Sequence, residues 1–377
     1  MSNESQPRVA VVGGGVIGVS SAYHLARGGA TVSLVTDGAL ASGASGRSLS
    51  WINAAGIRSE HYHRFRMIGI DRYRTLFARH PTLDWLRFDG GLRWRLGDRA
   101  GALDEVHIHE VAHGYDSQLL TPDEVTSRTP GINAAAIPAS GAIWNPGEGW
   151  VDLPSLINYL AHELVRLGGE LITNAGAAAV KVGGGRVRAV WTESSGDIEV
   201  DALLLATGSK VPQMVAEFGA TIPDATTMAL LIKTRPLESQ LQVVVNTPRV
   251  SLRPAPNGAL AVDADWAASG IEVRTDGTYG VRAEIIEELL AEASQVLTGA
   301  PRLSVAAYAI GPKPVPGDGE PVLGQVGNIG GLYVAFTHSG ATLALIVGEL
   351  LAYEIMTGRQ HPLLAPFRPD RFSEGAP

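Results

Sequence analysis

Residues 8–35 read RVAVVGGGVIGVSSAYHLARGGATVSLV, and the architecture of the chain follows from this stretch. The apolar, β-branched run over residues 8–12 predicts a buried parallel strand, residues 19–28 predict a helix, and residues 31–35 predict a second strand. A G-x-G-x-x-G turn lies between the first strand and the helix. A glycine turn in this strand–turn–helix–strand context is typical of a dinucleotide-binding domain.

Each glycine of this turn has a separate mechanical role. Gly13 permits the tight turn, Gly15 lets the backbone approach a pyrophosphate, and Gly18 lets the helix pack closely on the strand. We expect the backbone N–H groups of Val16 and Ile17, in the turn that leads into this helix, to face the phosphates.

The end of the second strand leaves two residues open for ribose binding. An acidic residue normally ends this strand and holds the adenosine ribose, but here Thr36 occupies that place and Asp37 follows it. Either Asp37 reaches the ribose hydroxyls or Thr36 forms a weaker hydrogen bond, and we favour Asp37.

Residues 41–56, ASGASGRSLSWINAAG, replace the further crossover helix that a nicotinamide enzyme normally has here. This small, hydroxyl-rich loop can hydrogen-bond a pyrophosphate and a ribityl chain and still leave room for a flat ring system. We therefore expect cofactor contacts from Ser42, Ser45, Arg47 and Ser48.

Composition excludes several other classes of function. The 30 basic and 38 acidic residues give a net charge of −8, which disfavours nucleic acid as a partner. The absence of cysteine excludes disulfides, thiolate metal sites, a cysteine nucleophile and a cofactor tethered through sulfur. The amino terminus does not resemble a signal peptide and no apolar run is long enough to span a bilayer, so we expect a cytoplasmic protein with no membrane span.

Further motifs follow the glycine turn in the order found in one known family. They are the loop at 42–56, PGEGWVDLP at 146–154 before an amphipathic helix over 155–167, DALLLATG at 201–208, GPKPVPGDGEPVLG at 311–324 and LYVAFTHSGATL at 332–343. With these motifs the chain resembles the FAD-dependent oxidoreductases of the D-amino acid oxidase superfamily. It is most similar to the glycine oxidase, sarcosine oxidase and dimethylglycine dehydrogenase branches.

The resemblance implies further FAD contacts. The backbone at Val180 is expected to touch the adenine ring, and the apolar helix expected over residues 343–356 is expected to point the N–H groups at its start toward the flavin ring, where its dipole stabilises negative charge. Small residues at the end of a buried strand let a cofactor pass close by. The residues implied in this way are Val180, Ala206, Thr207, Gly208, Gly311, Ser339, Gly340, Ala341 and Thr342.

Two residues in the later motifs are candidates for catalysis. The resembled family usually has arginine at the third place of Gly-Pro-x-Pro, where a planar guanidinium grips a substrate carboxylate, but this chain has Lys313. A lysine there could pair with a carboxylate, sit by the flavin ring, or assist electron transfer to oxygen. His338 either faces the active site or is a structural histidine of the turn.

Candidate substrate residues come from the same loop and from elsewhere. Arg58 and Arg253 could hold a substrate anion, and Asn53 and His61 lie close in sequence to the expected flavin contacts. A helix expected over 102–111 carries histidines whose side chains point apart, so we interpret it as a solvated face and expect no metal site.

These patterns predict an α/β fold with two interleaved domains. A Rossmann-like FAD-binding domain is expected over 1–78, 148–222 and 308–377, and an α+β substrate domain built on an antiparallel sheet over 79–147 and 223–307. Strands of that sheet are expected at 91–96, 228–233, 242–245 and 259–263.

The resemblance implies FAD-dependent oxidation of a C–N bond. A hydride would pass from the carbon beside an amine to flavin N5, water would hydrolyse the imine, and oxygen could accept the electrons. Covalent relatives attach FAD through a cysteine or a histidine near Trp51, whereas this chain reads Trp-Ile-Asn-Ala-Ala-Gly, so we expect non-covalent FAD. Open alternatives are oxidation of a 2-hydroxy acid or other alcohol and a non-catalytic FAD-binding subunit. A nicotinamide-dependent reductase is disfavoured because no second dinucleotide motif occurs.

Overall fold

The computed structural model describes residues 6–95, 101–327 and 329–373. The chain divides into two compact units, and each is described by itself. Unit 1 comprises Met1–Gly46, Leu153–Thr227 and Pro312–Pro377, and unit 2 comprises Arg47–Asp152 and Met228–Gly311.

Unit 1 is built on a 6-stranded sheet. Five neighbouring strands run parallel and the edge strand β21 pairs antiparallel with β22. Their order is β21 (Val322–Gln325), β22 (Leu332–Phe336), β13 (Ala202–Leu205), β1 (Arg8–Val12), β2 (Thr31–Val35) and β9 (Glu170–Ile172). Strand β13 and the last four residues of β1 are apolar and buried because both faces of a parallel sheet are covered.

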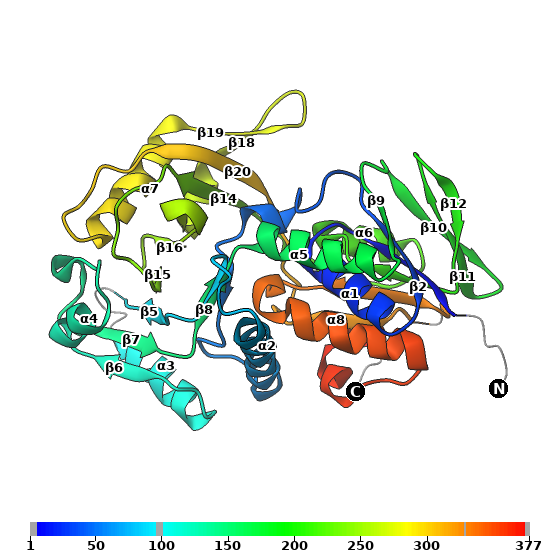
Figure 1. The fold of residues 1–377 in the computed structure, drawn as a ribbon, viewed down its shortest axis with the longest axis horizontal. Coiled ribbons are helices and arrows are strands. Elements are labelled where there is room, and N and C mark those ends of the chain that lie inside the picture. The colour runs from blue at the N-terminus through cyan, green and yellow to red at the C-terminus, as the bar shows by residue number, and fades with distance from the viewer. Residues whose placement is uncertain (1–5, 96–100, 328, 374–377) are drawn as a thin grey trace. The chain divides into compact units, whose positions relative to one another are not determined.

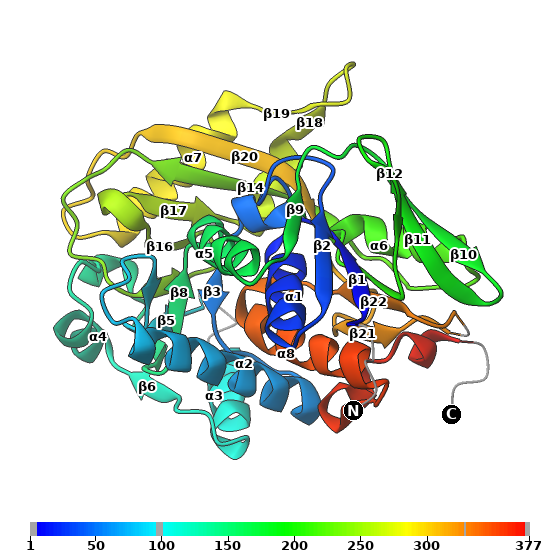
Figure 2. The ribbon, with the colours of Figure 1, turned by 45° about the vertical axis from the view of Figure 1, so that its right-hand side comes forward.

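Helices cover this sheet. The helix after the glycine turn, α1 (Val16–Arg27), packs beside β2 and against α5 (Leu153–Arg166) and α8 (Gly340–Thr357), as Figure 2 shows. Gly348 of α8 lies so close to α1 that an added Cβ would be 2.4 Å from Ser20 Oγ. The short α6 (Val211–Ala216) follows the 3-10 turn Gly208–Lys210.

Helix α8 is apolar for a structural reason. By length and composition it is the one helix of the described residues that could cross a membrane, with a mean hydropathy of 1.4, but 61% of it is buried inside the protein. Its position against α1 makes it a core helix of unit 1.

The strands between residues 170 and 205 divide between two sheets. A separate 3-stranded antiparallel sheet contains β10 (Ala178–Gly183), β11 (Arg186–Thr192) and β12 (Gly196–Glu199). Strand β9 instead joins the parallel sheet beside β2. Strand β12 ends at Glu199, and the chain then enters the parallel sheet as β13.

Unit 2 is built on an 8-stranded sheet. Its order is β20 (Val305–Lys313), β14 (Thr227–Thr234), β17 (Leu260–Asp263), β16 (Ser251–Pro254), β15 (Val244–Asn246), β5 (Gly91–Arg93), β7 (Ala142–Asn145) and β6 (Gln118–Leu120). Strands β15 and β5 pair in parallel, and the pairs from β14 to β15 and from β5 to β6 are antiparallel. All four expected strands of the substrate domain lie in this sheet.

Helices and two small sheets complete the described part of unit 2 (Figure 1). The helices are α2 (Glu60–Arg79), α3 (Gly101–Ala112), α4 (Pro122–Arg128) and α7 (Ala283–Val296). The small sheets are β3 (Trp51–Ile52) with β8 (Gly149–Val151) and β4 (Leu86–Arg87), and β18 (Ile271–Val273) with β19 (Tyr279–Val281).

Residues 47–78 group with unit 2, whereas the sequence assigned them to the FAD-binding domain. Strand β3 pairs with β8, and Arg66 of α2 donates to the Asn53 carbonyl at 2.9 Å. Farther along α2, Arg74 donates to the Gly147 carbonyl at 2.7 Å. These contacts tie the loop and α2 to unit 2.

Candidate cofactor and substrate sites

The glycine turn of unit 1 is tight at two positions and open at one. Gly13 has φ +129°, and an added Cβ there would be 2.3 Å from the Ala206 carbonyl oxygen. A Cβ at Gly18 would be 2.0 Å from the Gly13 carbonyl oxygen. At Gly15 the nearest atom would be Ser45 Oγ at 3.3 Å. The turn therefore leaves its backbone open beside Gly15, where an approaching phosphate needs room.

Two helices of unit 1 begin side by side at this turn. An added Cβ on Gly340, the first residue of α8, would be 3.7 Å from Val16 Cγ1 and 3.9 Å from Ile17 Cγ1 of α1. Neither helix has an acidic residue in its first turn or a side-chain hydrogen bond from its N-cap residue. The positive ends of both helix dipoles therefore meet at one place, which favours an anionic cofactor.

The hydroxyl-rich loop also reaches this place. Ser45, in the 3-10 turn Ala44–Arg47, accepts a hydrogen bond from the Val16 N–H at 3.0 Å. The Ala41 N–H donates to the Gly14 carbonyl at 3.0 Å. The structure thus brings the loop and the glycine turn together.

The two candidates for the ribose differ in accessibility. Thr36 is buried, and an added Cβ on Gly14 would be 2.7 Å from its hydroxyl oxygen. Asp37 is exposed and forms an ion pair with Lys210 at 2.7 Å. Sequence reasoning missed Lys210, although it is one of four lysines and lies two residues after the Ala-Thr-Gly motif.

The remaining expected FAD residues of unit 1 lie on several elements. Ala206, Ser339 and Thr342 are buried, Val180 is half-buried in β10, and Ser42 is exposed. Thr207, Gly208 and Ala341 are half-buried. In unit 2, Gly311 packs against Arg47, since an added Cβ would be 2.5 Å from the Arg47 guanidinium carbon. Ser48 is half-buried in the same unit.

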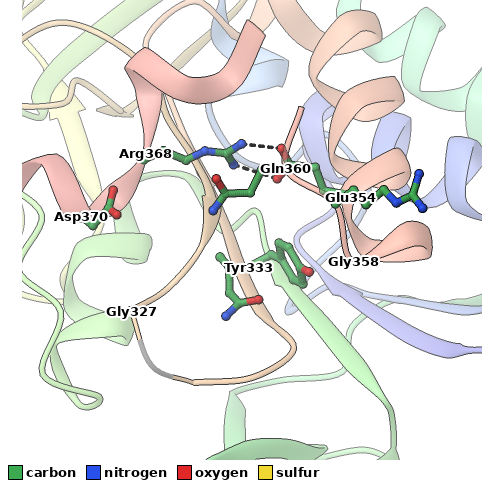
Figure 3. A pocket seen from close by; sticks show the side chains of 9 residues that line it. Gly327, Tyr333, Glu354, Gly358, Gln360, Arg368 and Asp370 are labelled. Carbon is green, nitrogen blue, oxygen red and sulfur yellow. Dashed lines mark hydrogen bonds and ion pairs between the residues drawn. The ribbon is translucent and has the colours of Figure 1, made fainter. Parts of the chain in front are cut away.

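A small polar pocket lies at the other end of α8 (Figure 3). Its volume is about 160 Å³, and its lining includes Gln325, Tyr333, Gln360 and the buried ion pair of Arg368 with Glu354. An 18-residue helix is about 27 Å long at 1.5 Å per residue. The pocket is therefore separate from the glycine turn, which lies at the first residue of that helix.

Unit 2 contains a fully buried carboxyl group, Glu148. It accepts hydrogen bonds from Trp51 Nε1 at 2.7 Å and from the Tyr115 hydroxyl at 2.5 Å. Burial raises the pKa of Glu148 to about 8, against the opposing effects of Tyr115 and Arg93. The group is therefore largely neutral at pH 7.

A second buried carboxyl group, Glu110, is ionised. Its Oε1 accepts from Arg93 at 2.7 Å and from the Gly56 N–H at 2.7 Å. Burial opposes ionisation, but Arg93 and the Gly56 N–H outweigh it and hold the pKa of Glu110 below its ordinary value.

Asn53, an expected substrate residue, is held internally. Arg66 donates to both its backbone carbonyl and its side-chain oxygen, at 2.9 and 2.7 Å. The Asn53 amide nitrogen donates to the Trp51 carbonyl at 3.1 Å. These contacts give Asn53 a role in shaping the loop.

Arg58, two residues after the loop, is half-buried. Its Nε donates to the Ala55 carbonyl at 3.1 Å and its guanidinium lies 5.3 Å from the centre of the Tyr62 ring. Among the described residues it forms no ion pair. Burial, with the charges of Arg66 and Arg93, lowers the pKa of Arg58 to about 10. A half-buried cation without a counter-ion is a site that an anion would stabilise.

Arg253, the other expected anion-binding residue, has internal partners. It is buried, donates to the carbonyls of Leu49 and Pro254, stacks over Trp150 at 4.9 Å and lies 3.9 Å from Asp152. Of the two arginines, Arg58 is therefore the better candidate to hold a substrate anion.

The other candidates lie on three different elements. His61 is exposed in the first turn of α2, His338 is exposed in the turn before α8, and Lys313 is half-buried at the end of β20. In the part of the chain that the structure describes, no group of three or more histidine, aspartate or glutamate residues could hold a metal ion.

The expected solvated face over 102–111 is partly wrong. Helix α3 buries Leu103 and Glu110, and His107 and His109 are half-buried. The helix turns a carboxylate inward because Arg93 and the Gly56 N–H donate hydrogen bonds to it there.

Known proteins resemble the chain over nearly its whole length. A family model described as FAD dependent oxidoreductase (DAO) matches residues 8–354. The chain is 27% identical to sarcosine oxidase subunit beta of Arthrobacter sp, covering 97% of this chain and 91% of that protein, and 27% identical to glycine oxidase of Pseudomonas aeruginosa, covering 96% and 98%.

A solved structure agrees with the fold. The crystal structure of glycine oxidase from Geobacillus kaustophilus matches with a TM-score of 0.82 at 23% identity, covering 97% of this chain and 99% of that chain. The family resemblance expected from the motifs is therefore confirmed, and the chain belongs to the FAD dependent oxidoreductase family.

Proposed function

We propose that the protein uses FAD to oxidise the C–N bond of a small amine that carries a carboxylate. The observation that supports this substrate class is Arg58, a half-buried guanidinium without a carboxylate partner among the described residues. Relatives named for oxidation of glycine and sarcosine, both amines with a carboxylate, support the same class.

In this proposal unit 1 holds the cofactor. The open backbone at Gly15, the starts of α1 and α8, and Ser45 accommodate its phosphates and flavin ring, and the exposed Asp37 binds the ribose. Bound FAD would supply a hydride acceptor for the carbon beside the nitrogen, and water would then hydrolyse the resulting imine.

Unit 2 binds and orients the substrate. Arg58 pairs with the carboxylate, and this pair fixes the position of the amine. Because a neutral amine needs no strong base, the absence of a catalytic dyad in the sequence is no obstacle. Lys313 and His338 are proposed as catalytic residues because their motifs resemble those of the family. Oxygen is the proposed electron acceptor. The proposed location of the protein is the cytoplasm.

An anaerobic bleaching screen tests the proposed function. Purified yellow protein is mixed without oxygen with glycine, sarcosine, proline, amines lacking a carboxylate, and 2-hydroxy acids. Loss of the yellow colour with carboxylated amines is expected. Bleaching by hydroxy acids alone would replace C–N oxidation with alcohol oxidation, and yellow protein that never bleaches would indicate a non-catalytic subunit.

Arg58 is then tested with the substrate that the screen identifies. Arg58→Met is expected to raise KM by about 10- to 100-fold, the value of a lost charge-assisted hydrogen bond. Arg58→Lys keeps the positive charge but loses the planar guanidinium that can donate two parallel hydrogen bonds to a carboxylate. It is therefore expected to raise KM less than Arg58→Met does. An unchanged KM in Arg58→Met would remove this residue from the site, and the same assay on Lys313→Met tests the second cation.

A further inference from the structure

The segment Ala54–Arg58 is held at alternate backbone N–H groups by side chains. The Ala54 N–H donates to the Tyr115 hydroxyl at 3.0 Å and the Gly56 N–H donates to Glu110 Oε1 at 2.7 Å. The Arg58 N–H donates to His109 Nε2 at 3.4 Å. All three acceptors lie on α3 or in the turn that follows it.

These acceptors are themselves anchored to the interior of unit 2. Glu110 is paired with Arg93 of β5 at 2.7 Å and accepts from Asn145 of β7 at 3.3 Å. Tyr115 donates to Glu148, which precedes β8. The segment is thus connected, through α3 and its following turn, to the rigid strands of the central sheet.

Burial of Glu110 has no benefit for packing alone. A buried carboxylate and guanidinium lose their hydration, and apolar residues of similar size often give equal or better stability. Helix α3 nevertheless exposes Ile108 at 66% and Val111 at 50% while Glu110 is completely buried. What Glu110 supplies, and an apolar residue would not, is an acceptor for the Gly56 N–H.

We infer that Glu110, Tyr115 and His109 are positioning residues, which hold Ala54–Arg58 so that the Arg58 guanidinium is set in advance for the substrate carboxylate. This inference rests on the proposed function of Arg58. A cation already fixed in place loses less conformational freedom when its ligand binds, so preorganisation increases affinity. Loosening the segment should therefore weaken binding of the carboxylate and spare the later steps.

The first test separates KM from kcat in single variants. Tyr115→Phe and His109→Leu, which each remove an acceptor of the segment, are expected to raise KM for the carboxylated amine by about 2- to 10-fold, the value of one hydrogen bond, with kcat nearly unchanged. Glu110→Gln keeps an oxygen acceptor for the Gly56 N–H but removes its charge, so a smaller rise in KM is expected. His109→Gln offers a side-chain acceptor again and should restore KM. Glu105→Gln, the same change at an exposed position of α3, is the matched control and should behave as wild type.

A double-mutant cycle tests whether these residues act through Arg58. In the Arg58→Met background, Tyr115→Phe and Glu110→Gln should have no further effect on KM, because the group that they position is gone. Glu110→Gln removes a buried charge and could unfold the protein. If it does, Tyr115→Phe and His109→Leu decide the outcome of the test. Additive effects, or unchanged KM in both of these variants, would overturn the inference.

A binding measurement separates this inference from the proposed reaction. Acetate, an unreactive carboxylate, is titrated into the yellow protein and its Kd is read from the change in flavin absorbance. The positioning role is supported if the positioning variants raise the Kd for acetate in the wild-type background and not in the Arg58→Met background. This result would hold even if no amine is oxidised. A Kd that responds to Arg58→Met but to none of the three positioning variants would refute it.

Discussion

Glu148 is a single carboxyl group whose environment makes the stability of the protein depend on pH. It is completely buried, and its hydrogen bonds from Trp51 and Tyr115 do not compensate for the loss of water. Burial raises its pKa to about 8. Because the folded state holds the proton more tightly than the unfolded state, this stabilisation is complete below the unfolded pKa of about 4.3 and is lost as pH rises towards 8.

Glu148→Gln tests this linkage, since glutamine keeps the shape and does not ionise. The free energy of unfolding of the variant minus that of wild type is expected to be larger at pH 8 than at pH 5. The reason is that only the wild type must bury a charge at high pH. Urea unfolding at the two pH values measures the difference. A stability difference that is the same at both pH values would show that Glu148 ionises normally.

Individual residues also show what a motif can and cannot reveal. Arg58 and Asn53 could be identified because they lie in or beside the loop that follows the glycine motif. Glu110, Tyr115 and Glu148 contact that loop from positions 54 to 97 residues away. Glu148 lies in the PGEGWVDLP motif, but no local pattern marks Glu110 or Tyr115, and a buried carboxylate is recognised only by the donors that surround it.

Helix α3 shows why an element can be predicted while its buried face is not. Its length and position follow the expected range, but its inward side carries Glu110 and its outward side carries Ile108 and Val111. Sequence patterns assume that apolar residues turn inward. Here hydrogen bonds to Gly56 and Arg93 decide the orientation, because the loop and strand that supply them are distant in sequence.

Helix α7 follows the ordinary pattern. Ile285, Leu289, Ala293 and Val296 recur at helical spacing and are buried on the core side of the unit 2 sheet. Leu289→Ala is expected to lower the free energy of unfolding by about 2–5 kcal/mol through lost burial and a cavity. Glu287→Ala on the exposed face should change it by less than about 0.5 kcal/mol. Denaturant unfolding of both variants checks this, and equal effects would contradict the packing described.

Across the whole molecule, the chain passes repeatedly between two units. Unit 1 is marked by sequence motifs, whereas unit 2 is marked by buried charged residues. Unit 1 collects most of the recognised motifs: the glycine turn, the Ala-Thr-Gly end of β13 and the start of α8. Unit 2 collects the buried charges around Arg58 and Glu110. The cofactor was therefore more accessible to sequence reasoning than the substrate.

Removal of the cofactor is a prediction for the molecule as a whole. The sequence has no cysteine, and Ile52, beside Trp51, is apolar and completely buried. Acid precipitation should therefore release flavin into the supernatant. The stripped protein should melt at a lower temperature than the FAD-bound protein. Added FAD at 100 times its Kd should raise the free energy of unfolding by about 2.7 kcal/mol. A pellet that stays yellow would indicate a covalent bond and contradict this.

The sequence by itself determined the dinucleotide-binding topology, the family and the cofactor. These depend on short, contiguous requirements, such as a glycine at position 18, where an added Cβ would be 2.0 Å from the Gly13 carbonyl oxygen. Only the tertiary structure decided which charges are buried, that Arg253 is satisfied internally while Arg58 is not, and that α3 holds the loop. The physical reason is that ionisation and hydrogen bonding inside a protein depend on neighbours contributed by distant segments, which only the completed fold brings together.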